Sequence, residues 1–199
     1  DLPPGTRVVV DISGPIYKSL IREPGTDKYM SCILNLLEKL FRLKCQPIFV
    51  FDGHAPKEKS AVIIERRRVK GRAQSALNDL EEHKRKVSLF MESSSSGSSM
   101  ENSLTEDDIQ RMDIDLNQTD LVQELTNHMI SLNEQETRLR RRAVGITEVH
   151  INNVKNLLNL FGIPYLQLDM EADVVCASLV KAGVADYCIS EDTDLLAYG

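Results

Sequence analysis

Short apolar runs rich in β-branched and aromatic residues alternate along this chain with longer stretches of helical spacing. The runs predict four strands, at 8–10, 47–51, 162–166 and 187–190. The helical spacing and one long charged stretch predict helices at 13–21, 25–43, 57–80, 147–161 and 172–182. Because strands alternate with helices, we expect an α/β fold with a mostly parallel, twisted sheet and helices on both of its faces.

The stretch between the second and third strands is long and less regular. Ser93 to Ser99 is a serine run interrupted by Gly97, which predicts a loop or a disordered segment. Helical spacing is weaker over 113–132, and 136–142 predicts a charged helix. We therefore expect one domain in three parts, with 1–86 as the first part of the core, 87–136 as an acidic, serine-rich, partly disordered insertion and 137–199 as the remainder.

The net charge of −6 is unevenly distributed along the chain. From Glu92 to Glu136 there are eleven acidic residues and one basic residue, Arg111, so the rest of the chain has a net charge of +4. The whole-chain charge is therefore a poor guide to the partners of the protein. With 42% hydrophobic and 27% charged residues, a soluble globular protein is expected. No apolar run approaches the roughly 20 residues that span a bilayer, and no secretory signal is apparent.

The cysteines favour a reduced, intracellular protein. They are scattered through apolar contexts, and none has the CxxC or Cys/His spacing of a zinc site. We expect core thiols rather than disulfides. The four residues are Cys32, Cys45, Cys176 and Cys188.

Acidic residues stand where the predicted strands end or just beyond them. In a parallel sheet, ligands bind outside the carboxyl ends of the strands, so these acids should converge on one edge. Carboxylates that converge cannot all keep their charge unless a cation lies among them. The pattern predicts a divalent-metal site with oxygen ligands, and such sites commonly hydrolyse phosphate esters. The six residues are Asp11, Asp52, Glu171, Asp173, Asp192 and Asp194.

Six sequence blocks resemble the flap-endonuclease/XPG family of structure-specific 5′ nucleases. They occur in the order of that family, and together the match covers about two-thirds of the chain. The resemblance implies a PIN-like nuclease core with a helical-arch insertion. The blocks are Val9 to Tyr17, Val50-Phe-Asp-Gly53, Gly162-Ile-Pro-Tyr165, Glu171-Ala-Asp173, Ala177 to Gly183 and Glu191-Asp-Thr-Asp194.

The resemblance also implies a role for each acid. Asp11, Asp52, Glu171 and Asp173 would surround one Mg²⁺ or Mn²⁺, and Asp192 and Asp194 would hold a second. The implied mechanism is phosphodiester hydrolysis by two metals about 4 Å apart. The family more often has Glu-x-Glu where this chain has Glu-x-Asp, so the shorter Asp173 could coordinate through water. Taken alone, an Asp after a strand is as often a helix N-cap as a ligand.

The resemblance also implies that certain basic and aromatic residues contact DNA. Lys59 and Arg66 are about two helical turns apart and match the pair that contacts the scissile phosphate. Tyr17 matches an aromatic that stacks on the nucleotide beside the cut, although it could be a plain core residue. Arg140, Arg141 and Arg142 resemble the basic rim of the arch, but such a run could also be a solvated face or a localisation signal.

The function that the resemblance implies is a divalent-metal-dependent 5′ endonuclease or exonuclease. Its substrate would be branched DNA with a flap, bubble or junction, in replication, repair or recombination. Two alternatives are a non-catalytic PIN-like scaffold that binds DNA or protein and a PIN nuclease that cleaves RNA. Sliding-clamp or repair proteins are possible partners, and no membrane is expected. The location would be intracellular, and nuclear in a eukaryote.

Three departures from the family qualify the resemblance. Family members usually begin with Met-Gly and a short helix, which this sequence does not include. A seventh carboxylate and a helix–hairpin DNA-binding element lie beyond the last block, so we expect the second metal to need a ligand that follows Gly199. The distance from Asp52 to Glu171 is longer than in compact flap endonucleases, as in excision-repair members with long inserts.

Overall fold

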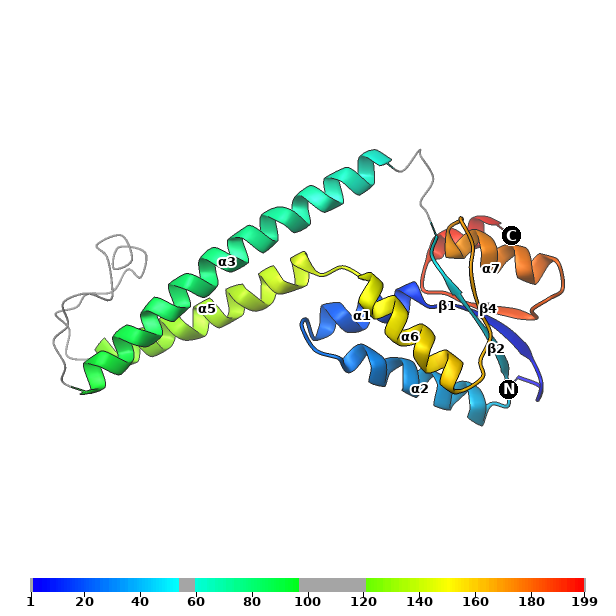
Figure 1. Cartoon of the computed structure of the whole chain (residues 1–199), viewed down its shortest axis with the longest axis horizontal. Helices are drawn as coiled ribbons and strands as arrows, with labels where there is room; N and C mark the ends of the chain where they lie inside the picture. Colours follow the sequence, from blue (N-terminus) through cyan, green and yellow to red (C-terminus); the bar gives the residue numbers. More distant parts are fainter. Residues whose placement is uncertain (1, 54–59, 97–120, 199) are drawn as a thin grey trace. The chain divides into compact units, whose positions relative to one another are not determined.

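A computed structural model describes residues 2–53, 60–96 and 121–198 of the chain (Figure 1). The chain divides into two compact units. The first contains residues 1–67 and 144–199, and the second contains residues 68–143. The predicted acidic site belongs entirely to the first unit.

The first unit is built on a four-stranded parallel sheet with the order β3-β2-β1-β4. In the register, Val9 of β1 lies opposite Ile48 of β2 on one side and opposite Cys188 of β4 on the other. Val50 of β2 lies opposite Leu166 of β3. These pairings confirm the parallel sheet. The strands are β1 (Arg7–Asp11), β2 (Gln46–Phe51), β3 (Tyr165–Gln167) and β4 (Tyr187–Ile189).

Helices cover both faces of this sheet, as expected (Figure 1). Side chains alternate along a strand, so Val8 and Val10 enter the larger core while Val9 enters the smaller one. Three helices cover the larger core and one covers the smaller core. They are α1 (Ser13–Arg22), α2 (Lys28–Arg42) and α6 (Glu148–Leu160) on one face, and α7 (Ala172–Lys181) on the other.

Two long helices, α3 (Ser60–Ser96) and α5 (Leu121–Ala143), build the second unit, which takes α3 from residue 68 onward. Helix α3 continues past the expected end at Leu80, through the expected boundary at residue 86 and through Ser96. No Gly or Pro interrupts it after Gly71, and Val87 and Phe90 add an apolar stripe that packs in a small core. The serine run is therefore helical over 93–96, and the loop predicted there was wrong; 97–99 lie outside the described residues.

Helix α5 is one element where the sequence predicted two. The residues between Leu132 and Glu136 are Asn, Glu and Gln, which a helix accommodates, so no break occurs. Residues 113–120 of the first predicted segment lie outside the described residues. The insertion that we placed at 87–136 thus has helical residues at both ends.

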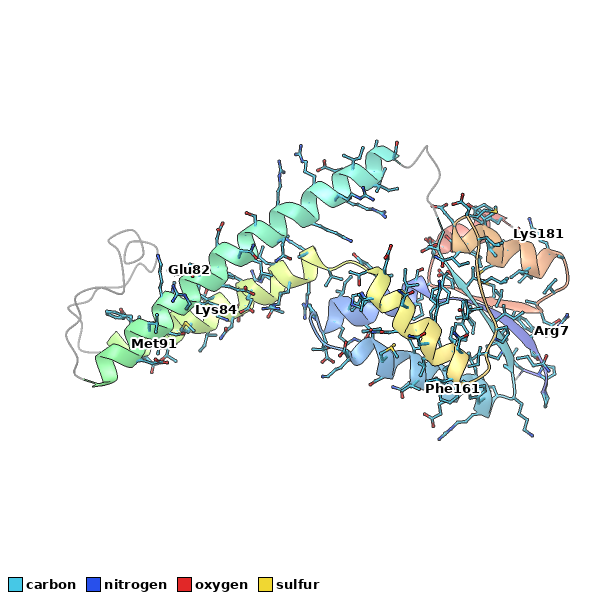
Figure 2. All side chains as sticks on the ribbon, in the orientation of Figure 1. Arg7, Glu82, Lys84, Met91, Phe161 and Lys181 are labelled. Atoms are coloured by element: carbon cyan, nitrogen blue, oxygen red, sulfur yellow. The ribbon has the colours of Figure 1, made fainter. Side chains whose placement is uncertain are left out.

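Apolar contacts and ion pairs join α3 to α5. Val87 and Phe90 pack against Leu125 and Leu132 of α5. Lys84, labelled with Met91 on α3 in Figure 2, forms an ion pair with Glu136. The hydrogen bond from Lys84, more than that from Arg140, holds the pKa of Glu136 below its usual range, although partial burial opposes it.

A histidine pair links the same two helices. The Nε2 atoms of His83 and His128 are 3.2 Å apart and the ring centroids 5.5 Å apart, so the two nitrogens face each other and share one proton. Burial, and then the neighbouring His83, lower the pKa of His128. Because the pKa of His128 is lower in the folded protein than in the unfolded chain, the folded state loses stability as the pH falls below the unfolded value of about 6.5.

We expect the helix pair to open more easily as the pH falls from about 7.5 to 5, because a second proton puts two N–H groups face to face. Hydrogen exchange of residues 77–96 and 121–140 across this pH range would measure the effect. The His128→Gln variant removes the titrating ring and should flatten the dependence. If hydrogen exchange in the variant depended on pH as it does in the wild-type protein, groups other than His128 would be responsible for the opening.

Two smaller observations concern the predictions on membranes and thiols. Within the described residues, no helix combines the length and the apolar character needed to cross a membrane. The four cysteines are free thiols, as predicted. Cys45 and Cys176 are buried, while Cys32 and Cys188 are half-buried.

Candidate active site

Asp11 ends the central strand β1 and is held there by two hydrogen bonds. Its Oδ1 accepts from the backbone N–H of Ser13 at 2.9 Å, and its Oδ2 accepts from the Ser190 hydroxyl at 3.2 Å. The residue is only 7% exposed. Burial raises the pKa of Asp11, and the charges of Asp52 and Asp192 raise it further, against the two hydrogen bonds. A carboxylate in this position gains from a nearby cation.

Asp52 follows β2 and is tied to the start of α7. Its Oδ1 accepts from the backbone N–H of Ala172 at 2.9 Å, and its carbonyl oxygen accepts from Gln167 Nε2 at 2.9 Å. The backbone N–H of Gly53 donates to the Met170 carbonyl at 2.9 Å. The end of β2 and the segment that leads into α7 therefore hold each other in place.

The second acid pair lies at the start of α7, as the sequence predicted. Glu171 is the N-cap residue, in an extended conformation, and Asp173 lies in the first turn. Burial raises the pKa of Asp173 to about 6, with further contributions from the charges of Asp11, Asp192, Asp52 and Glu171 in that order. Its Oδ1 is buried and has no hydrogen-bond partner. Asp173 is thus a carboxylate near four other acids, and its Oδ1 has no hydrogen-bond donor.

The third pair follows β4. Asp192 is exposed, and its backbone N–H donates to the Ser190 hydroxyl at 3.1 Å. Asp194 lies in a short 3₁₀ helix, η2 (Thr193–Tyr198), but its side chain is outside the described part of the structure. Every predicted acid whose side chain the structure describes therefore interacts electrostatically with others at one edge of the sheet; these acids are Asp11, Asp52, Glu171, Asp173 and Asp192.

These residues fit a divalent cation. Hard cations such as Mg²⁺ prefer carboxylate oxygens, and the buried Oδ1 of Asp173 is an acceptor that nothing in the described chain satisfies. A cation would also offset the repulsion that raises the pKa of Asp11 and Asp173. Among the described residues, no three His, Cys, Asp or Glu side chains already form a group that could hold a metal as they stand.

Ser190 was not singled out by the sequence, yet its hydroxyl joins two of the acids. It donates to Asp11 and accepts from the backbone of Asp192. Removing a group that orients metal ligands typically weakens metal binding 10–100-fold. We therefore expect Ser190→Ala to raise the Mg²⁺ concentration for half-maximal cleavage roughly tenfold.

A Mg²⁺ titration of the cleavage rate measures this effect. Ser178→Ala is the matched control, because the Ser178 hydroxyl donates to the Val174 carbonyl within α7. An unchanged Mg²⁺ requirement in Ser190→Ala would show that the hydroxyl does not orient the acids.

The predicted DNA contacts remain predictions, but one of these residues, Arg140, already forms ion pairs within the protein. Tyr17 is 41% exposed on α1 and Arg66 is exposed on α3, whereas Lys59 lies outside the described residues. Arg140 is engaged within the second unit, since its Nη2 lies 2.8 Å from both Glu81 Oε1 and Glu136 Oε1. Its position favours a role in joining α5 to α3. Its neighbours Arg141 and Arg142 are exposed.

Comparison with known proteins places the chain in a family. Residues 5–74 match the XPG N-terminal domain, and residues 162–199 match the XPG I-region. These two segments contain all six acids, and the matches occur in the order expected. The chain belongs to the flap-endonuclease/XPG family. The resemblance inferred from the sequence blocks is confirmed.

Individual relatives are similar over nearly the whole chain. A probable RAD2-like endonuclease of Invertebrate iridescent virus 3 is 29% identical over 200 residues, which is 97% of this chain and 50% of the relative. Flap endonuclease 1 of Aedes aegypti is 28% identical over 206 residues, 98% of this chain and 42% of the relative. The chain therefore spans half or less of the length of these relatives.

A solved structure confirms the fold. The catalytic core of Rad2, in complex with DNA substrate, aligns with a TM-score of 0.53 at 21% identity. The alignment covers 97% of this chain and 38% of the Rad2 chain. The expected PIN-like α/β nuclease fold is thus confirmed.

Proposed function

We propose that this protein is a divalent-metal-dependent, structure-specific nuclease that hydrolyses phosphodiester bonds in branched DNA. One observation carries the proposal. Asp173 has a pKa raised to about 6 by burial and by four other acids, and its buried Oδ1 has no hydrogen-bond partner. Such a cluster of carboxylates is stable at neutral pH with cations bound. Membership of the XPG family supports the choice of DNA as the substrate.

We further propose that the cofactor is a pair of Mg²⁺ or Mn²⁺ ions. Asp11, Asp52, Glu171 and Asp173 would hold one ion, and Asp192 with Asp194 would hold the other. When bound, such ions lower the pKa of a water molecule and stabilise charge on the leaving 3′ oxygen.

The remaining residues would act on the DNA directly. Lys59 and Arg66 would neutralise the phosphoryl oxygens as charge builds on them. Tyr17, exposed on the surface of α1, would stack on a base beside the cut. Arg141 and Arg142 are exposed on α5 and would contact the DNA backbone.

The proposal also includes protein partners and a cellular location. Sliding-clamp or repair proteins would bind through the acidic segment between Glu92 and Glu136 or through regions outside this sequence. The location would be intracellular, and nuclear if the source is a eukaryote.

A comparison of substrates tests the proposal. Equal amounts of protein are incubated with Mg²⁺ and labelled 5′-flap DNA, bubble DNA or single-stranded RNA. We expect cleavage of at least one branched DNA and little cleavage of the RNA. Cleavage of RNA alone would indicate a PIN ribonuclease. DNA binding without cleavage of any substrate would indicate a scaffold.

A further inference from the structure

Glu191, between the serine that binds Asp11 and the acid Asp192, contacts α1. The Ser190 hydroxyl donates to Asp11, whereas Glu191 Oε1 lies 2.9 Å from Lys18 Nζ. The segment after β4 is therefore held by two contacts, one with Asp11 and one with α1.

The contact with α1 passes over a residue without a side chain. A Cβ atom at Gly14 would lie 3.3 Å from Glu191 Oε2, 3.5 Å from its Cβ and 3.6 Å from its Cγ. Gly14 and Lys18 are four residues apart, so they occupy the same face of α1, one turn from each other. The Glu191 side chain thus lies flat against the bare backbone of Gly14 and reaches Lys18 at its tip.

This contact is too exposed to contribute much to global stability. The side chain of Lys18 is 63% exposed and that of Glu191 is 37% exposed. Exposed ion pairs of this kind typically contribute little to the stability of the whole fold. The contact instead acts locally, because it fixes to α1 the segment that carries Asp192. Asp192 interacts with the charges of Asp11 and Asp173, and since like charges repel, a tether on this segment keeps Asp192 near the other acids.

We propose that Lys18 and Glu191 are positioning residues that hold the segment bearing Asp192 and Asp194 against α1 and so keep the metal site assembled. The proposal rests on the proposed function only in assigning a metal to the site. It requires no contact of either residue with DNA or with a metal ion.

Mn²⁺ binding and hydrogen exchange without DNA test the tether. The variants are Lys18→Gln, Glu191→Gln and the charge reversal Lys18→Glu with Glu191→Lys. We expect each single variant to bind Mn²⁺ up to about fivefold more weakly, by calorimetry or by electron paramagnetic resonance, which is the most that an exposed ion pair of this kind can contribute. Amides of residues 190–198 in the metal-free protein should also exchange faster. The charge reversal should restore both properties towards the wild-type values.

Lys28→Gln is the matched control, because Lys28 forms an exposed ion pair with Glu23 at the start of α2, in a segment that carries none of the acids. It should leave Mn²⁺ binding and the exchange of 190–198 unchanged. Single variants that match the wild-type protein in both measurements would overturn the proposal, as would a charge reversal that restores neither. Both readouts are independent of cleavage, so they remain informative even if the protein cuts no DNA.

Discussion

Replacing Asp173 with Asn should stop cleavage and at the same time raise the melting temperature of the metal-free protein. The loss of activity should be on the order of a thousandfold or more, as for other groups that stabilise charge in a transition state. The gain in stability follows from the crowding of acids, since Asp11, Asp192, Asp52 and Glu171 all raise the pKa of Asp173. Asn has nearly the same shape but no charge, so it removes this repulsion.

The gain in stability from Asp173→Asn should depend on pH, and the raised pKa of Asp173 gives its direction. The folded-state pKa of Asp173, about 6, is above the ordinary aspartate value of 3.8, so protonation favours the folded state. Its contribution to stability is complete below about pH 4 and is lost as the pH rises through 6. The melting temperatures of wild type and variant should therefore be close at pH 4.5 and differ most at pH 7.5.

Asp186→Asn is a suitable control, because Asp186 lies at the opposite end of the sheet and pairs with Arg7. The hydrogen bond from the Arg7 side chain lowers the pKa of Asp186, so this variant should lose rather than gain stability, and it should keep its cleavage activity. A lower melting temperature for Asp173→Asn at pH 7.5 would contradict the crowding of acids at the carboxyl edge.

Gly53→Ala should destabilise the fold and weaken metal binding at the same time, and this is the second-largest effect that we expect. A Cβ atom at Gly53 would lie 1.8 Å from the carbonyl oxygen of Leu168 and 2.9 Å from the backbone nitrogen of Met170. The obstacle is backbone, so the segment that leads into α7 must move. Overpacking of this kind costs about 3 kcal/mol. The same movement breaks the bond between Asp52 and the Ala172 N–H, which aligns the two acidic segments.

Denaturant unfolding and Mn²⁺ titration measure the two consequences. Gly71→Ala provides a matched control, because nothing lies within 4 Å of a Cβ at Gly71, in the interior of α3. That change should stabilise the helix by about 0.5–1 kcal/mol and leave Mn²⁺ binding intact. A Gly53→Ala protein with wild-type unfolding and Mn²⁺ binding would show that the two segments are not locked together.

The arrangement of the core could be predicted because local patterns and topology agreed. Val8–Val10 and the run that ends at Phe51 are too apolar for anything but buried strands, and parallel strands bring Asp11 and Asp52 to one edge. The acids at the start of α7 followed from the helix spacing after β3. The end of α3 was missed, since the stretch after Leu80 is charged and serine tolerates helix and loop alike, whereas the packing of Val87 and Phe90 against α5 is visible only in the fold.

The supporting contacts of the site could not be read from the sequence. Ser190 and Lys18 are ordinary polar residues, and their roles depend on partners 179 and 173 positions away in the chain. Gly53 belongs to a block that the sequence identified. The reason that this position has no room for a side chain is the Leu168 backbone, which lies against it only in the folded structure. Arg140 was expected among DNA contacts, and its pairing with Glu81 depends on how two helices meet.

The most direct test is cleavage of a labelled 5′-flap DNA by the intact protein in Mg²⁺, in EDTA, and after Mg²⁺ is restored. We expect cleavage in Mg²⁺, none in EDTA and full recovery on restoration, and no cleavage by Asp52→Ala although that variant still binds the DNA. Cleavage that continues at the same rate in EDTA, or in Asp52→Ala, would contradict a metal-dependent nuclease at this edge of the sheet.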